Sequence, residues 1–115
     1  MSAVHELRIY HCAQGRLAAL HRRFEEATLP LWRRHGIEAV GFWTTEVGPS
    51  NQALTFMICW DSLAARERIW SAFSNDAEWL AARERFESEG PIVARIENQL
   101  SLIHISEPTR PLYIS

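Results

Sequence analysis

The stretch that decides the fold covers residues 37–60 and reads IEAVGFWTTEVGPSNQALTFMICW. Residues 37–47 and 53–60 are rich in β-branched and aromatic side chains, which favour extended strands. Between them, the sequence GPSN at residues 48–51 is a dense cluster of turn-forming residues. This pattern predicts a β-hairpin in the middle of the chain.

One strand and one helical region are predicted on each side of this hairpin. Residues 4–12 and 92–100 alternate in the manner of β-strands, so they are the expected first and last strands. After Gly15, apolar residues recur every three or four positions, which predicts a helix that ends at Gly36. Pro30 lies inside this helix and predicts a bend or an interruption there, because proline removes a helical hydrogen bond.

The chain after the hairpin carries its own signals for the start of a helix. Residues 61–62 and 75–76 offer side-chain oxygens that suit the N-caps of two successive helices, and the second helix is expected to end at residues 90–91. The inner stripe of the first helix is expected to include Leu63, Trp70 and Phe73. The second helix carries Trp79, Ala82, Arg83 and Phe86.

The resulting order of elements is βαββαβ. This order predicts an α+β, ferredoxin-like domain, in which a four-stranded antiparallel sheet is covered by both helical regions on one face. A length of 115 residues fits one such domain. The other face of the sheet then has no helix to cover it.

Composition excludes several classes of function. The net charge is −2 with both signs scattered along the chain, so neither nucleic acid nor an anionic membrane surface is expected as a partner. No apolar run approaches the length of a membrane span, and we expect a cytoplasmic protein. The twelve basic residues are all arginine, which excludes a lysine Schiff base.

Metal and cofactor sites are not expected either. Cys12 and Cys59 show no CxxC spacing, and the histidines show no HxH or HExxH spacing, so we predict free thiols and no metal site. The sequence contains no P-loop, GxGxxG or GxSxG motif, and no cofactor is predicted.

The C-terminal residues have a sequence that is unusual for a natural protein. Residues 101–110 read SLIHISEPTR, which matches the translation of a transposon-based sequencing-library adapter. We therefore expect residues 1–100 to form the domain and residues 101–115 to be an artefactual tail.

Alternation along the strands predicts which side chains lie on the open face of the sheet. In strand one, Leu7 and Ile9 are expected to face the helices, with Glu6, Arg8 and Tyr10 on the open face. The second strand is expected to place on the open face either Trp43 and Thr45 or Phe42 and Thr44, and we favour Trp43. The third and fourth strands are expected to place there Thr55, Met57, Cys59, Val93, Arg95, Glu97 and Gln99.

An open face of this composition is too apolar for water and too polar for an ordinary core. We therefore predict a homodimer in which two sheets face each other and enclose a barrel. Arg8, Tyr10, Trp43 and Arg95 are the expected ligand-binding residues, since arginines beside aromatic rings suit a small aromatic or amphiphilic molecule with an anionic or phenolic group. The alternative is that these charges are solvated or paired across strands, with Arg8 answering Glu97. No catalytic residue is assigned.

The sequence also resembles a known family. Residues 41–83, which include the Trp43-Thr44-Thr45 run and the 48–51 turn, resemble the NIPSNAP family, and ELRIY at residues 6–10 is similar to its opening strand. Ala77 stands where the family usually has a proline. Further shared features are Ser62-Leu63 with Arg66, Trp70, and Asp76 before Glu78-Trp79.

The resemblance implies a dimeric α/β barrel and no particular reaction. Three functions remain open, in this order: a barrel that binds a small aromatic or amphiphilic molecule, a cofactor-independent enzyme of the monooxygenase or isomerase type that uses the same cavity, and a dimeric interaction module without a ligand.

Overall fold

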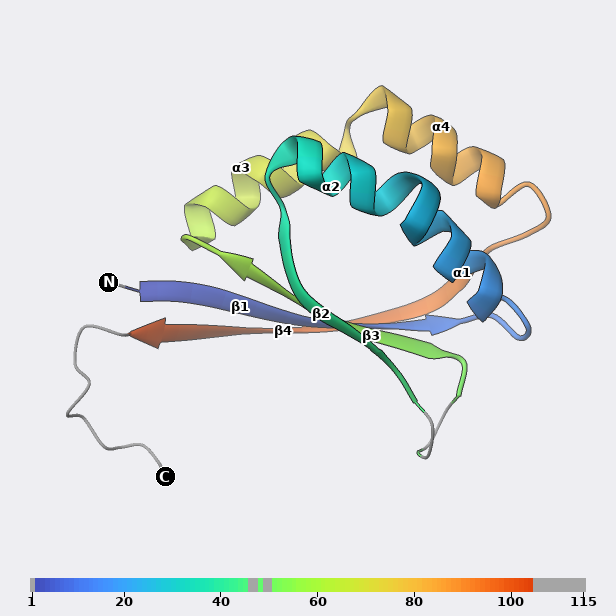
Figure 1. Ribbon diagram of the computed structural model, residues 1–115, viewed down its shortest axis with the longest axis horizontal. Coiled ribbons are helices and arrows are strands. Elements are labelled where there is room, and N and C mark those ends of the chain that lie inside the picture. The colour runs from blue at the N-terminus through green and yellow to red at the C-terminus, as the bar shows by residue number, and fades with distance from the viewer. Residues whose placement is uncertain (1, 46–47, 49–50, 105–115) are drawn as a thin grey trace.

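The computed structural model describes residues 2–45, 48 and 51–104. The elements in chain order are β1 (Ser2–Cys12), α1 (Leu17–Arg23), the π-helical segment η1 (Phe24–Thr28), α2 (Leu29–His35), β2 (Glu38–Thr44), β3 (Ala53–Trp60), α3 (Leu63–Ser74), α4 (Ala77–Phe86) and β4 (Val93–His104). The strands form one antiparallel sheet in the order β2-β3-β1-β4. All the helices lie on one side of it (Figure 1), which is the predicted α+β, ferredoxin-like architecture.

The predicted hairpin is present and consists of β2 and β3. Its register runs from Glu38 opposite Cys59 to Thr44 opposite Leu54. Residues 46–47 and 49–50, which include half of the predicted turn, lie outside the described residues.

The first helical region is irregular close to Pro30, as predicted, although the helix continues through the proline itself. The irregularity is the π-helical segment Phe24–Thr28, directly before α2. Pro30 lies in the first turn of α2, where a missing N–H is tolerated. Gly36 ends the helix in the left-handed conformation at φ 79°, as its position predicted.

The second helical region begins at the predicted caps. Ser62 Oγ accepts a hydrogen bond from the Ala65 backbone N–H at 3.0 Å, and Asp76 Oδ1 accepts from that of Glu78 at 2.8 Å. The expectation for Leu63 is wrong, because its position in the first turn of α3 leaves it 51% exposed.

The helix α4 ends at Phe86, earlier than predicted, and a turn connects it to β4. Arg16 stabilises this end, since its Nη2 donates to the carbonyl oxygens of Phe86 and Gly90 at 3.1 and 3.3 Å. A side chain from the β1–α1 connection thus satisfies carbonyls at the end of α4.

The last strand is longer than predicted. β4 begins at Val93 and continues past Leu100 to His104, with residues 101–104 paired to residues 2–5 of β1. Residues 105–115 lie outside the described residues, and the adapter origin of residues 101–115 stays a prediction.

The facing of β1 is opposite to the prediction. Glu6, Arg8 and Tyr10 are buried between the sheet and the helices, whereas Leu7 and Ile9 lie on the open face. A shift of one residue exchanges the two faces of a strand. The usual rule that apolar side chains point inward fails here because the buried charges have partners inside the protein.

The predicted facing of the other strands is confirmed with one exception. Val93, expected on the open face, packs against the core instead, because the register between β1 and β4 shifts between His11 and Cys12. Leu54, Phe56, Ile58 and Trp60 of β3 are buried under the helices, and Trp43 of β2 lies on the open face opposite Thr55. On β4, Arg95 and Glu97 pair in register with the open-face residues of β1, which places them on the open face too.

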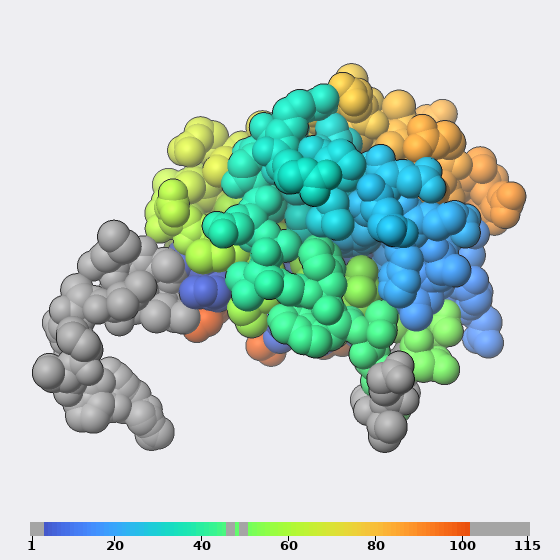
Figure 2. Space-filling view, in the orientation of Figure 1, coloured from blue at the N-terminus to red at the C-terminus, as the bar shows by residue number. Residues whose placement is uncertain are grey.

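The helices pack on the upper side of the sheet in the space-filling view (Figure 2). The centre of this packing is aromatic: Phe24 packs edge-on against Phe56, with ring centroids 5.4 Å apart, and against Trp32 at 5.7 Å. No described helix is both long and apolar enough to cross a membrane.

Candidate functional site

A carboxylate lies in the core beneath the helices. Glu6 is fully buried. Its Oε1 accepts hydrogen bonds from Trp60 Nε1 at 3.0 Å and Arg66 Nε at 2.9 Å. Its Oε2 accepts from Arg8 Nη1 at 2.8 Å, Asn98 Nδ2 at 3.0 Å and Arg66 Nη2 at 3.1 Å. Glu6 therefore joins three strands and α3 at one point.

The environment keeps Glu6 ionised. Burial by itself would raise its pKa, but the hydrogen bonds from Arg66 and Asn98, the charge of Arg8 and the hydrogen bond from Trp60 outweigh burial and lower the pKa from 4.5 to about 2. These bonds fill the acceptor capacity of the carboxylate. Glu6 is consequently a structural anion and has no free lone pair with which to accept a proton from a substrate.

Arg8 connects this carboxylate to aromatic rings. Its Cζ lies 4.6 Å from the ring centroid of Trp70 and 5.5 Å from that of Tyr10. Arg8 Nε is buried and has no hydrogen-bond partner among the described residues. The aromatic rings and Glu6 thus hold the Arg8 guanidinium in place, while its Nε–H donates no hydrogen bond among the described residues.

A cavity of about 440 Å³ lies beside Arg8, between the sheet and the helices. This is within the usual size range for small-molecule sites. Its aromatic lining consists of Tyr10, Phe24, Trp32, Trp70, Phe73 and Trp79.

Three of these rings form a row along the helix side of the cavity. The ring centroids of Trp70 and Phe73 are 5.4 Å apart, and those of Phe73 and Trp79 are 4.8 Å apart. Arg8 lies against Trp70 at one end of the row, and Arg23 lies 5.3 Å from the Trp79 ring at the other. The row therefore has a guanidinium at each end.

Four residues that line the cavity each have a buried polar side-chain atom with no hydrogen-bond partner among the described residues. These atoms are Arg8 Nε, Arg23 Nε, Thr28 Oγ1 and Trp32 Nε1. The four residues are 8%, 4%, 2% and 1% exposed, respectively. Unsatisfied buried polar groups are costly and uncommon in native proteins, and three of these four atoms can only donate.

Arg23 has one weak partner at the edge of the cavity. Its Nη1 donates to Glu87 Oε2 at 3.3 Å, and the same oxygen lies 3.9 Å from Nε of the exposed Arg83. Burial lowers the pKa of Arg23, and the Glu87 carboxylate opposes that shift. Two arginines therefore share one carboxylate.

The π-helical segment supplies part of the site. Phe24 and Thr28, its first and last residues, both line the cavity, and Arg23 directly precedes it. Short π segments inside α-helices occur often at functional sites.

The structure brings together only part of the predicted ligand site. Arg8 and Tyr10 both line the cavity, but they do so on the helix side of the sheet. Trp43 is 51% exposed on the open face and borders a separate groove of about 300 Å³ with Phe42 and Leu54.

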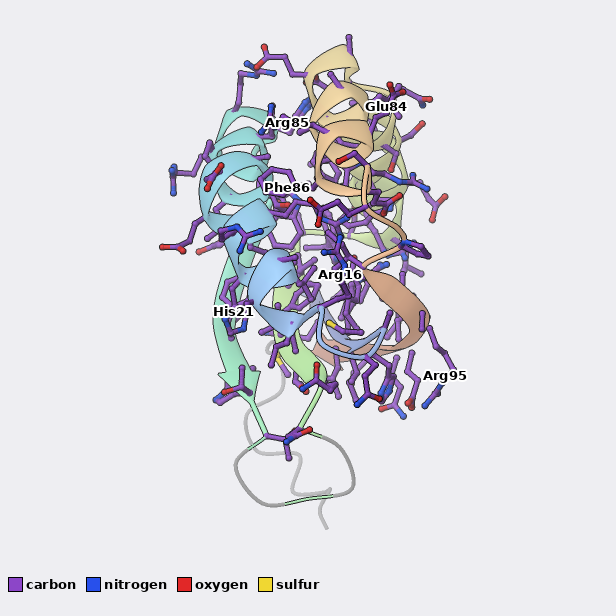
Figure 3. All side chains as sticks on the ribbon, turned by 90° about the vertical axis from the view of Figure 1, so that its right-hand side faces the viewer. Arg16, His21, Glu84, Arg85, Phe86 and Arg95 are labelled. Atoms are coloured by element: carbon purple, nitrogen blue, oxygen red, sulfur yellow. The ribbon has the colours of Figure 1, made fainter. Side chains whose placement is uncertain are left out.

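Arg95 borders the same cavity as Arg8, but its guanidinium is engaged elsewhere. Arg95 Nη1 donates to Glu97 Oε2 at 2.9 Å, and His11 Nε2 contacts the same oxygen at 2.5 Å. Figure 3 shows the Arg95 side chain on the side of the sheet away from the helices. The expected pairing of Arg8 with Glu97 is therefore wrong, because the two side chains lie on opposite faces.

Sequence reasoning missed Arg23, Thr28 and Trp32 as cavity residues and Glu6 as the buried anion. A signal for two of them exists. Arg23 and Thr28 adjoin the apolar stripe of the first helix, and a polar residue at the border of such a stripe is a candidate for a buried polar contact. Among the described residues, no group of three or more histidine, cysteine or acidic side chains is arranged to hold a metal ion.

Solved structures share this fold at low sequence identity. An uncharacterised NIPSNAP-like domain protein from Burkholderia xenovorans is 21% identical with a TM-score of 0.77, over 90% of this chain and 86% of that one. A NIPSNAP family protein of unknown function from Agrobacterium tumefaciens is 22% identical with a TM-score of 0.76, over 92% of both chains. A putative antibiotic biosynthesis monooxygenase from Bordetella bronchiseptica is 16% identical with a TM-score of 0.60, over 90% and 97%.

The search of curated proteins gave no significant match. The family model described as NIPSNAP matches residues 5–106, which is nearly all of the described chain. This match also extends beyond the resembling segments at residues 6–10 and 41–83. The chain therefore belongs to the NIPSNAP family.

Proposed function

We propose that the protein binds a small aromatic or amphiphilic molecule in the cavity between the sheet and the helices. The observation that carries this proposal is that four residues lining one cavity, Arg8, Arg23, Thr28 and Trp32, each have a buried polar atom without a hydrogen-bond partner among the described residues. A ligand with oxygen acceptors would satisfy these atoms, and the aromatic lining would pack against its apolar body.

The test is a titration that uses the protein's own fluorescence. Trp32, Trp70 and Trp79 line the cavity, so a bound aromatic molecule should change tryptophan emission. We expect saturable binding of 2-naphthol or 2-naphthoate to the full chain. Absence of saturable binding by both compounds, confirmed by calorimetry, would contradict the proposal.

A substitution at Thr28 separates a binding cavity from a poorly packed core. Thr28→Val removes a buried hydroxyl that has no partner in the described part of the chain, so it should stabilise the ligand-free protein by about 1 kcal/mol. It should also weaken naphthol binding, because the ligand loses a hydrogen bond. Thr55→Val, on the open face, is the matched control and should leave binding unchanged.

A reaction in the same cavity ranks second. Structural relatives described as putative antibiotic biosynthesis monooxygenases favour it, but at 11% and 16% identity they carry the fold alone. Binding ranks first because the buried carboxylate of Glu6 is fully engaged by hydrogen bonds and has no free lone pair for a reaction. An interaction module without ligand becomes the preferred function if the titrations fail.

We further propose that the protein is a homodimer joined through the open face of the sheet. Leu7 and Ile9 on β1, Met57 on β3 and Trp43 on β2 give this face a larger apolar area than the sequence predicted. An apolar sheet face without helices favours burial against a partner. A second copy supplies a surface of the same kind.

A cytoplasmic location is also proposed. Cys12 and Cys59 are both free, and unpaired thiols suit a reducing compartment.

A further inference from the structure

Positive and negative side chains balance at one end of the cavity but not at the other. At the Arg8 end, Glu6 accepts hydrogen bonds from Arg8 and Arg66, and Arg66 also pairs with Glu67 at 2.8 Å, so the charges balance. At the other end, Arg23 and Arg83 have only Glu87 between them. This end carries an excess positive charge among the described side chains.

The bond between Glu87 and Arg23 is poorly placed for a permanent ion pair. It is a single contact of 3.3 Å to Nη1, and it leaves Arg23 Nε without an acceptor. The Glu87 side chain is 31% exposed, so it can move into water at little cost. Glu87 is also the C-cap of α4, where a negative charge is disfavoured by the helix dipole.

We propose that the ligand is an aromatic anion whose carboxylate displaces Glu87 from Arg23, which makes Glu87 a specificity-determining residue. This inference rests on the proposed function and adds the charge of the ligand and the residue that it replaces. A ligand carboxylate can engage the buried guanidinium through two parallel hydrogen bonds, whereas Glu87 makes one. The aromatic body of the ligand then lies against Trp79, beside Arg23.

Internal competition by Glu87 has a measurable consequence. A carboxylate that must be displaced lowers the affinity for anions, and it repels them while it remains nearby. A neutral ligand of the same shape does not compete for the guanidinium in this way. Removal of the Glu87 charge should therefore favour anions selectively.

The experiment compares 2-naphthoate with its neutral isostere 2-naphthamide on the full chain, with dissociation constants measured by calorimetry. Wild-type protein should bind 2-naphthoate more tightly than 2-naphthamide. Glu87→Gln should tighten 2-naphthoate binding by about fivefold or more and leave 2-naphthamide nearly unchanged. Arg23→Met should abolish the preference for the anion.

Glu84→Gln is the matched control, because it removes the same charge from the same helix. Glu84 is exposed, and Figure 3 shows it on the outer side of α4. It should change neither affinity. If Glu84→Gln tightens 2-naphthoate as much as Glu87→Gln does, the effect is a general change in net charge and the inference is overturned.

Two other results would separate this inference from the proposed function. Equal binding of both compounds to wild-type and Glu87→Gln protein would overturn the role of Glu87 and leave the binding function intact. Binding of neither compound to either protein would overturn both. Circular dichroism on Arg23→Met shows whether a lost preference for the anion reflects loss of folding. If Arg23→Met is unfolded, the result for Glu87→Gln decides the inference.

Discussion

Glu6 is the residue on which the inner side of the sheet depends. A buried carboxylate is tolerated only when charges and hydrogen bonds replace the water that it has lost. Here Arg66 supplies two hydrogen bonds and Arg8, Asn98 and Trp60 supply one each. The same contacts hold Arg8 beside the cavity, so the stability of the core and the shape of the site depend on one side chain.

Glu6→Gln should therefore be strongly destabilising. The substitution removes the negative charge that pairs with Arg8 and Arg66. The new amide NH₂ group would also face N–H donors of these residues instead of acceptors. We expect a loss of about 3 kcal/mol or more in the free energy of unfolding, measured by urea denaturation. Glu67→Gln removes an exposed partner of Arg66 and should cost less than about 1 kcal/mol. Equal effects of the two substitutions would contradict the role of Glu6.

Glu6 also predicts how stability depends on pH. Its pKa is about 2 in the folded protein and 4.5 in the reference state, so the unfolded chain binds the proton first as the pH falls. The contribution of Glu6 is fully present above pH 4.5 and is lost as the pH falls through about 2.

Urea denaturation at several values between pH 5 and pH 2 checks this dependence. Wild-type protein should lose stability through this window, and Glu6→Gln should lose less, because it lacks the titrating group. Parallel profiles for the two proteins would show that other carboxylates cause the acid sensitivity.

At the scale of elements, local signals predicted most of the fold. The hairpin β2–β3, the αL cap at Gly36 and the side-chain caps at Ser62 and Asp76 each depend on a few neighbouring residues, and each is present. The facing of β1 depends instead on partners distant in sequence. Alternation alone gives two faces and cannot choose between them when the charged set has buried partners.

The position of the π-helical segment could not be predicted from the sequence, because it too depends on distant contacts. Pro30 signalled an irregularity, but the backbone placed it earlier, at residues 24–28, and kept the helix continuous. The resulting placement of Phe24 and Thr28 at the cavity depends on tertiary packing. Local propensity carries little information about such packing.

The end of β4 provides a test at this scale. Figure 1 shows the paired ends of β1 and β4 projecting past the helices, and β4 is an edge strand. Among the described residues, deletion of residues 101–115 removes only the pairing of residues 101–104 with residues 2–5 of β1, at the edge of the sheet. We expect the melting temperature to change by less than about 2 °C.

Differential scanning calorimetry measures this change, and deletion of residues 105–115 alone is the control. A large drop that occurs only when residues 101–104 are also removed would mean that these residues are a required part of the strand. That result would contradict the artefactual tail.

At the scale of the molecule, the sequence predicted part of the candidate site. The sequence predicts Arg8 and Tyr10 as site residues because they share one face of β1 and combine charge with an aromatic ring, and this holds whichever face of the sheet they occupy. The prediction of Trp43 and Arg95 depends on the assumption that these residues lie on the same face of the sheet as Arg8 and Tyr10. Once β1 turns its charged side toward the helices, this assumption fails.

The corrected facing strengthens the case for a dimer. Leu7 and Ile9 were expected inside, and their position on the open face makes that face more apolar around Met57 and Trp43. Leu7→Arg should therefore convert the dimer to a monomer, because burial of an unpaired guanidinium at an interface costs several kcal/mol, whereas exposure of it in a monomer costs little.

Sedimentation equilibrium at micromolar concentration measures the outcome, and circular dichroism confirms that the variant is folded. Gln14→Arg, an exposed substitution in the β1–α1 connection, adds the same charge away from the sheet and should remain dimeric. A wild-type protein that is monomeric under these conditions would contradict the dimer. It would leave the ligand proposal standing, because the cavity is bounded by residues of a single chain on the other side of the sheet.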